Sequence, residues 1–172
     1  LSTSDELEET ASMVEDEGGE ALTLHGGVSD ESDVENAVER TLDEFGRIDI
    51  LANNAGIATV ADMIELDESM WDELLGTNLK GVWLTSKHVG QHFVERGDGG
   101  KIVSTSSTAG LTGAIGTGHY AAAKHGVIGL TKTLALEMAE YDVNVNAVCP
   151  TAIQTPMVQG ITEAYGEEVL GE

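Results

Sequence analysis

Hydrophobic and polar residues follow two different spacings along this chain. In some segments apolar residues recur every three or four positions, as on one face of a helix, and in others they form short runs, as in buried strands. Strands that alternate with helices are typical of an α/β fold with a mainly parallel sheet, whose ligands bind beyond the carboxyl ends of the strands. The predicted helices are 4–17, 32–45, 67–96, 119–140 and 157–172, and the predicted strands are 21–25, 48–52, 101–105 and 143–148.

Local residues mark several of these boundaries. Ser32 with Glu35 has the spacing of a capping box at the start of the second helix. The long helix over 67–96 is interrupted near 76–78, where helix propensity falls. The helix over 119–140 is apolar or small on most faces. Because such helices are usually buried, it predicts contact with a second subunit.

Length and composition favour one folded domain. The chain has 172 residues, of which 41% are hydrophobic, so we expect residues 1–172 to form a single domain with a buried core. It contains neither an apolar run of roughly 18 residues that could span a membrane nor a recognisable secretion signal. The single cysteine, Cys149, suits a reducing compartment, and we therefore expect a cytoplasmic location.

The charge of the chain is strongly one-sided. Asp and Glu number 31 against 8 Lys and Arg, which gives a formal net charge of −23. A field of this sign repels phosphate groups and disfavours nucleic acids and anionic membranes as partners. Self-repulsion at this level destabilises a fold in dilute buffer and is screened by salt. Because the acids are spread along the whole chain, we interpret the excess as the mark of a salt-loving source.

A tyrosine and a lysine one helical turn apart give the first indication of chemistry. Tyr120 and Lys124 lie near the start of a predicted helix and point the same way. An ammonium beside a phenol favours the phenolate, and a phenol with a lowered pKa can exchange protons near neutral pH. Taken alone, the pair is more typical of a tyrosine ring packed on a lysine stem.

Three further features lie after predicted strands or within the long helix. Ser107 comes just past the strand over 101–105, where a hydroxyl can reach a ligand, and Asn53-Asn54-Ala55-Gly56 follows the strand over 48–52. Asn78 interrupts the long helix. Each feature has an ordinary alternative, namely a loop serine, a turn and a tolerated polar residue.

Taken together, these residues resemble the short-chain dehydrogenase/reductase family, in the family's order and spacing over residues 20–157. The resemblance implies a Rossmann-like, doubly wound parallel sheet. It also implies hydride transfer between a nicotinamide cofactor, NAD or NADP, and a small secondary alcohol or ketone. The matching motifs are Asn53-Asn54-Ala55-Gly56, Thr77-Asn78-Leu79, Ile102 to Ser107 with Ala109-Gly110, Tyr120-Ala121-Ala122-Ala123-Lys124, and Val143 to Pro150.

The resemblance also implies a role for each site residue. Tyr120 would exchange a proton with the substrate oxygen as general acid/base, and Ser107 would hydrogen-bond that oxygen. Lys124 would lower the pKa of Tyr120 and hold the nicotinamide ribose, and Asn78 would anchor a water linked to Lys124. No metal ion is expected in this set. The implied catalytic residues are Ser107, Tyr120, Lys124 and Asn78, and the implied cofactor-binding residues are Asn53, Ala55, Gly56, Tyr120, Lys124, Pro150, Ile153 and Thr155.

The sequence departs from the family pattern at both ends. The family begins with a strand, a Thr-Gly-x-x-x-Gly-x-Gly loop and a helix that holds the pyrophosphate. The nearest text, over 112–118, is one residue short and has no preceding strand, and few residues follow Pro150. We therefore expect a chain truncated at both ends, whose partial sheet lacks the first βαβ unit and the last strand.

Within the family, three segments look like the carveol-dehydrogenase-like branch, whose members act on secondary alcohols. These segments are 107–111, 123–127 and 150–157. Two smaller departures remain. Gly27 stands where the family commonly has an Asp that contacts adenine, and Thr151 stands where Gly usually follows the proline.

Two other interpretations stay open at this point. One is an inactive remnant that only associates through the helices over 68–96 and 119–140, and the other is a lyase or epimerase that uses the same Tyr/Lys pair. The spacing from Ser107 to Tyr120 favours the dehydrogenases over the lyases and epimerases. We predict an oxidoreductase that assembles as a homodimer or homotetramer, and we expect the isolated chain to have little activity.

Overall fold

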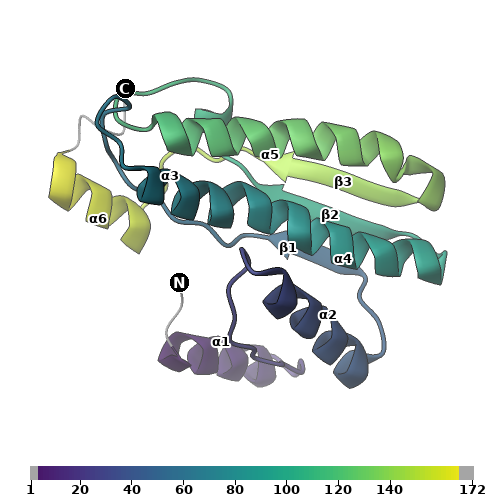
Figure 1. Cartoon of the computed structure of the whole chain (residues 1–172). Helices are drawn as coiled ribbons and strands as arrows, with labels where there is room; N and C mark the ends of the chain where they lie inside the picture. The colour runs from purple at the N-terminus through teal and green to yellow at the C-terminus, as the bar shows by residue number, and fades with distance from the viewer. Residues whose placement is uncertain (1–3, 167–172) are drawn as a thin grey trace.

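The computed structural model describes residues 4–166 and contains a three-stranded parallel sheet with helices against it (Figure 1). The strands β1 (Ile50–Asn53), β2 (Gly100–Thr105) and β3 (Val143–Val148) lie in the order β1-β2-β3. Helices form the connection between each pair of strands, as parallel pairing requires. The predicted α/β fold with a parallel sheet is confirmed.

Two long helices lie side by side in front of the sheet in Figure 1. Helix α4 (Gly81–Arg96) packs against β1 and β2, and α5 (Gly118–Glu137) packs against β3. Helix α2 (Glu31–Phe45) packs in turn against α4. The remaining helices are α1 (Ser4–Asp16), α3 (Glu68–Leu75) and α6 (Pro156–Tyr165), with short 3-10 turns at Thr108–Gly110 and Ala139–Tyr141.

The core lies between the sheet and helices α4 and α5. Phe93 of α4 and Ile102 of β2 are buried at its centre, together with Val89, Val143 and Val145. Each of these side chains contributes about 1.5–3 kcal/mol by leaving water. The opposite sheet positions are open to solvent in the described residues, since residues along β3 alternate between buried and exposed.

The predicted strand over 21–25 is wrong, because these residues are irregular in the structure. A strand needs a neighbouring backbone for its hydrogen bonds, and the sheet of the described residues offers none beside this segment. Leu24 and His25 instead line a cavity of about 380 Å³ whose other wall includes Ile50 and Leu51 of β1. The cavity separates the segment from the edge of the sheet.

The helix boundaries follow the prediction with local changes. Helix α2 begins one residue earlier than predicted, because Asp30 and not Ser32 is its cap. An Asp30 carboxylate oxygen accepts hydrogen bonds from the backbone N–H groups of Ser32 (2.8 Å) and Asp33 (3.4 Å). The predicted interruption of the long helix is a π-helical turn at Gly76–Lys80. Residues 167–172 of the last predicted helix lie outside the described residues.

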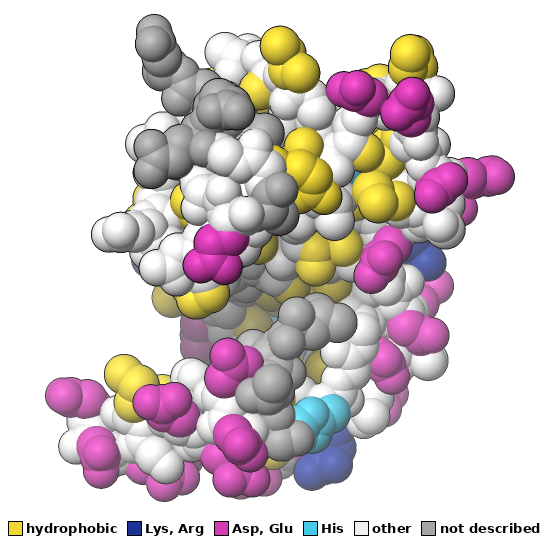
Figure 2. All heavy atoms as spheres, turned by 90° about the vertical axis from the view of Figure 1, so that its left-hand side faces the viewer, with side chains coloured by type: hydrophobic (Ala, Val, Ile, Leu, Met, Phe, Trp, Pro, Cys, Tyr) yellow, Lys and Arg dark blue, Asp and Glu magenta, His cyan; other side chains and the backbone are white. Residues whose placement is uncertain are grey.

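No helix within residues 4–166 combines the length and the apolar character needed to cross a bilayer. Acidic side chains instead cover much of the surface. Figure 2 shows Asp and Glu gathered in the lower part and along the right-hand side of one face, with few Lys and Arg among them, whereas hydrophobic side chains lie in its upper part.

Candidate active site

The segments that follow β2 and β3 are joined at the carboxyl edge of the sheet. The backbone N–H of Ser106 donates to the carbonyl of Val148 (2.8 Å), and that of Thr108 donates to the carbonyl of Pro150 (2.9 Å). These bonds continue the parallel pairing past the strand ends. They fix the loop that carries Ser107 against the segment that begins at Pro150.

Three of the predicted catalytic side chains meet above this edge. Tyr120 and Lys124 lie in the first turns of α5, and the Lys124 ammonium is 5.5 Å from the centre of the Tyr120 ring. Ser107 hydrogen-bonds the Tyr120 side chain, and its hydroxyl also accepts the backbone N–H of Ala109 (3.1 Å). The helical spacing therefore places a phenol, an ammonium and a hydroxyl in one cluster.

Burial shifts the pKa values of both titratable groups in this cluster. Burial raises the pKa of the Tyr120 phenol, and the hydrogen bond with Ser107 opposes that rise. Burial also lowers the pKa of the Lys124 ammonium. The direction for Tyr120 is opposite to the lowering expected from a neighbouring ammonium, because burial has the largest effect on the phenol. Lys124 Nζ donates its hydrogen bond to the carbonyl of Thr105 (2.7 Å).

Asn78 lies in the π-helical turn and is fully buried. Its amide makes two hydrogen bonds to one backbone residue, accepting from the N–H of Ile57 and donating to the carbonyl of Ile57, both at 2.8 Å. These bonds hold the loop after β1 against the helix. A Cβ added to the adjacent Gly56 would lie 3.4 Å from Asn78 Oδ1 and 3.9 Å from Lys124 Nζ. Gly56, Asn78 and Lys124 therefore converge on one place.

Asn53 ends β1 with its side chain buried in a polar network. Its amide nitrogen donates to the hydroxyls of Ser86 (3.0 Å) and Ser104 (3.1 Å), and its amide oxygen accepts from Thr85 (2.6 Å). These contacts pin the end of β1 to α4 and β2. The side chain of Asn53 therefore has a structural role at the carboxyl edge of the sheet. The backbone continues from Asn53 into the loop that contains Ala55.

The other predicted cofactor residues lie in the open part of the edge. Ala55 is exposed and Pro150 is half-buried. Ile153 is 57% exposed, and Thr155 caps α6 by accepting the backbone N–H of Val158 (3.3 Å). No contact described for these residues joins them to Tyr120 or Lys124, so their roles stay predictions.

Several groups that position the cluster were not predicted to have this role. The hydroxyl of Ser106 donates to the carbonyl of Lys124 (2.9 Å), and a Cβ on Gly110 would lie 2.8 Å from that carbonyl oxygen. Thr105 contributes only its backbone carbonyl, which no sequence pattern marks. The signal for Ser106 and Gly110 was present in the Ser/Thr run and its glycine, but a turn explains the same residues.

The glycine-containing segment over 112–118 does not form a phosphate-binding loop of the usual kind. It follows a 3-10 turn and not a strand, and residues 111–115 are exposed. The carbonyl of Gly116 accepts the backbone N–H of Ala61 (2.9 Å). The segment thus connects the loop after β1 to the start of α5.

Comparison with known proteins places this geometry in a family. The family model described as short chain dehydrogenase matches residues 1–166. A (-)-trans-carveol dehydrogenase of Rhodococcus erythropolis is 44% identical over 160 residues, which cover 92% of this chain and 58% of that protein. An uncharacterised NAD-dependent oxidoreductase of Mycobacterium tuberculosis is 38% identical over 157 residues, covering 91% of this chain and 57% of that protein.

A solved structure of the same family has a similar fold. The carveol dehydrogenase from Mycobacterium avium in complex with NAD superposes with a TM-score of 0.90 at 38% identity, covering 95% of this chain and 60% of that one. The chain therefore belongs to the short-chain dehydrogenase family, and its sheet is part of a Rossmann-like fold. It spans less than two thirds of the length of these relatives.

Proposed function

We propose that this chain provides the catalytic half of an NAD(P)-dependent oxidoreductase that interconverts small secondary alcohols and ketones. The observation that carries the proposal is the single cluster of Tyr120, Ser107 and Lys124 beyond the carboxyl ends of the strands. The relatives named carveol dehydrogenase, one of them solved with NAD, support the alcohol substrate and the nicotinamide cofactor.

The donor set fits the nicotinamide-ribose half of the cofactor. Lys124 supplies an ammonium for ribose hydroxyls beside Gly56, whose missing side chain keeps the approach to Lys124 open. Ile153 and Thr155 follow β3 on the same edge and are proposed to contact the nicotinamide end. Within residues 4–166 we find no strand, glycine loop and helix that would hold a pyrophosphate. The chain therefore supplies one half of a cofactor site.

In the proposed reaction, residues of this chain transfer the proton to and from the substrate oxygen. When bound, nicotinamide supplies or accepts the hydride at the substrate carbon. In the reducing direction Tyr120 gives its phenolic proton to the substrate oxygen, and Ser107 donates a hydrogen bond to the same oxygen. In the oxidising direction the phenolate takes the proton back. Lys124, held by the Thr105 carbonyl, favours that phenolate through its charge.

The protein is further proposed to act as a homo-oligomer in a salt-rich cytoplasm. The long helices α4 and α5 expose large apolar side chains, with Trp83 45% and Leu136 82% exposed. Such side chains are typical of subunit interfaces. The net charge of −23 supports the high-salt environment.

Titration with NADH and NADPH in high salt, followed by nicotinamide fluorescence, tests the cofactor proposal. We expect weak binding by the 172-residue chain and micromolar binding by a form extended to the length of its relatives. The extended form should also oxidise secondary alcohols. Absence of turnover in that form would instead support the inactive, association-only alternative.

A further inference from the structure

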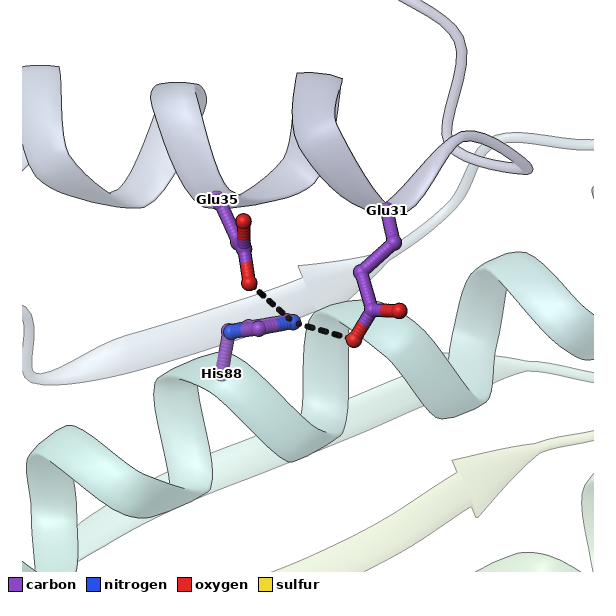
Figure 3. Close-up of side chains that lie close together, drawn as sticks. All are labelled: Glu31, Glu35 and His88. Carbon is purple, nitrogen blue, oxygen red and sulfur yellow. Dashed lines mark hydrogen bonds and ion pairs between the residues drawn. The ribbon is translucent and has the colours of Figure 1, made fainter.

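A second cluster of side chains with ligand chemistry lies where helix α2 packs on helix α4 (Figure 3). Glu31 and Glu35 are one helical turn apart on α2, so both carboxylates face the neighbouring helix. His88 on α4 points its Nε2 atom between them, 3.2 Å from Glu31 Oε1 and 3.8 Å from Glu35 Oε1. One ligand atom from each residue lies within 4.8 Å of the other two.

These distances are close to those that a metal ion imposes on its ligands. Zinc in a tetrahedral site holds oxygen and nitrogen ligands at about 2.0–2.2 Å, which separates neighbouring ligand atoms by roughly 3.3 Å. The two distances from His88 Nε2 lie on either side of that value. The Glu35 side chain is exposed, and a small movement of its carboxylate towards His88 would bring all three ligand atoms to metal-binding distances.

Burial and charge in this cluster also suit a cation. The His88 side chain is 11% exposed, so its ring is fixed between the helices, whereas Glu31 and Glu35 remain open to ions from solvent. Lys87 forms an ion pair with Glu31, and one ammonium neutralises only one of the two carboxylates. The chain as a whole carries a net charge of −23, which raises the local concentration of cations.

We propose that Glu31, Glu35 and His88 form a structural site for a divalent metal ion of the zinc class. Two carboxylate oxygens and one imidazole nitrogen would be the protein ligands, with water in the fourth position. An imidazole ligand favours Zn²⁺ or Co²⁺ over Mg²⁺, which prefers oxygen. The ion would fasten α2 to α4, the two helices that border the 380 Å³ cavity beside β1. The site lies outside the catalytic cluster and does not depend on the proposed reaction.

Cobalt titration of the untagged protein, stripped of metal, tests this site, because four-coordinate Co²⁺ absorbs visible light much more strongly than the hydrated ion. We expect a band that saturates at one equivalent and is displaced by Zn²⁺. Glu35→Gln and His88→Gln should each weaken Co²⁺ binding by roughly tenfold or more, since each removes one of three protein ligands. Lys87→Met should tighten binding, because it removes the cation that competes for Glu31.

His25→Gln is the matched control, because it removes an exposed imidazole outside the cluster, and it should leave the titration unchanged. The proposal is overturned if no saturable band forms, if Glu35→Gln binds as tightly as the parent, or if His25→Gln removes the band. If His88→Gln fails to fold, Glu35→Gln still decides, since Glu35 is exposed and its carboxylate contacts only His88 among the described interactions. Any of these three results would mean that the cluster of Glu31, Glu35 and His88 is an ordinary ion-pair network.

Discussion

The ammonium of Lys124 lies 5.5 Å from the centre of the Tyr120 ring, while its hydrogen bond goes to the carbonyl oxygen of Thr105. Among the described interactions, no direct hydrogen bond joins Lys124 to the phenol. This hydrogen bond holds the Lys124 ammonium at the end of β2. The chain alone leaves Tyr120 with a raised pKa, set by burial. A lower pKa for Tyr120 would depend on the cofactor and substrate that bind in the site.

Removal of the phenolic hydroxyl tests the proposed acid. Tyr120→Phe should lower the rate of alcohol oxidation in the extended form by roughly 10²–10⁴-fold, because a positioned general acid/base contributes that much. The ring keeps its packing, so the melting temperature should change little. Tyr141→Phe is the matched control, since Tyr141 is partly exposed in a 3-10 turn. Full activity in Tyr120→Phe would refute the assignment.

Lys124→Met should abolish activity without lowering thermal stability. The Lys124 ammonium is buried, its only described hydrogen-bond acceptor is a backbone carbonyl, and burial lowers its pKa from the ordinary 10.5. A lowered lysine pKa means that the unfolded chain binds the proton more tightly, so the parent gains stability as pH rises. Met fills similar space without the charge.

The difference in melting temperature between Lys124→Met and the parent should therefore be larger at pH 7 than at about pH 11, above the ordinary lysine pKa of 10.5, where the penalty of the charge disappears. Differential scanning calorimetry across this range measures it. Lys132→Met, at an exposed position of the same helix, should show no such trend. A variant less stable than its parent at neutral pH would show that the ammonium is well paired.

Much of the fold could be predicted from the sequence because the patterns that determine its helices and strands are local. Strand β3 was predicted at its exact bounds, since Val143 and Val145 alternate with polar residues and Pro150 follows. The segment over 21–25 also mixes apolar and polar residues, but it is irregular. Whether a segment forms a strand depends on a neighbouring backbone, and the sequence of the segment does not show whether that neighbour is present.

The candidate site was predictable where helical spacing fixes geometry and not where backbone atoms take part. The spacing of Tyr120 and Lys124 on one helix alone places them together. The Thr105 carbonyl, by contrast, has no side-chain signature. Burial, which raises the pKa of Tyr120, is a property of the whole fold and could not be predicted from that spacing. The metal cluster on α2 and α4 was missed because its members are distant in sequence.

Asn78 should prove important for stability as well as for the site. Asn78→Ala removes a fully buried amide, leaves the half-buried N–H and carbonyl of Ile57 without their partners, and should lower the free energy of unfolding by about 2–4 kcal/mol. Asn36→Ala, on the exposed side of α2, should not lower it. Urea unfolding of both variants checks the expectation. An unchanged midpoint for Asn78→Ala would mean that water replaces the amide.

The association proposal predicts a homodimer or homotetramer in light scattering coupled to size exclusion. Replacing Trp83 and Leu136 by Ser should shift the protein towards a monomer, since both are exposed on the long helices α4 and α5. Leu111→Ser, which changes an exposed apolar residue outside these helices, should keep the parent's mass. A parent that is monomeric at all concentrations contradicts the proposal.

Stability should rise with salt because of the net charge. With 31 acidic and 8 basic side chains, repulsion dominates in dilute buffer, and the Debye length falls from about 10 Å at 0.1 M to about 3 Å at 1 M. The melting temperature should therefore increase steeply between these concentrations of KCl. Helix α1 offers a matched test, because Glu8, Glu9 and Glu15 are exposed on it. Their triple change to Gln should reduce the salt dependence and raise stability in dilute buffer. An identical salt slope in the triple variant would show that general salt effects, and not charge repulsion, set the stability.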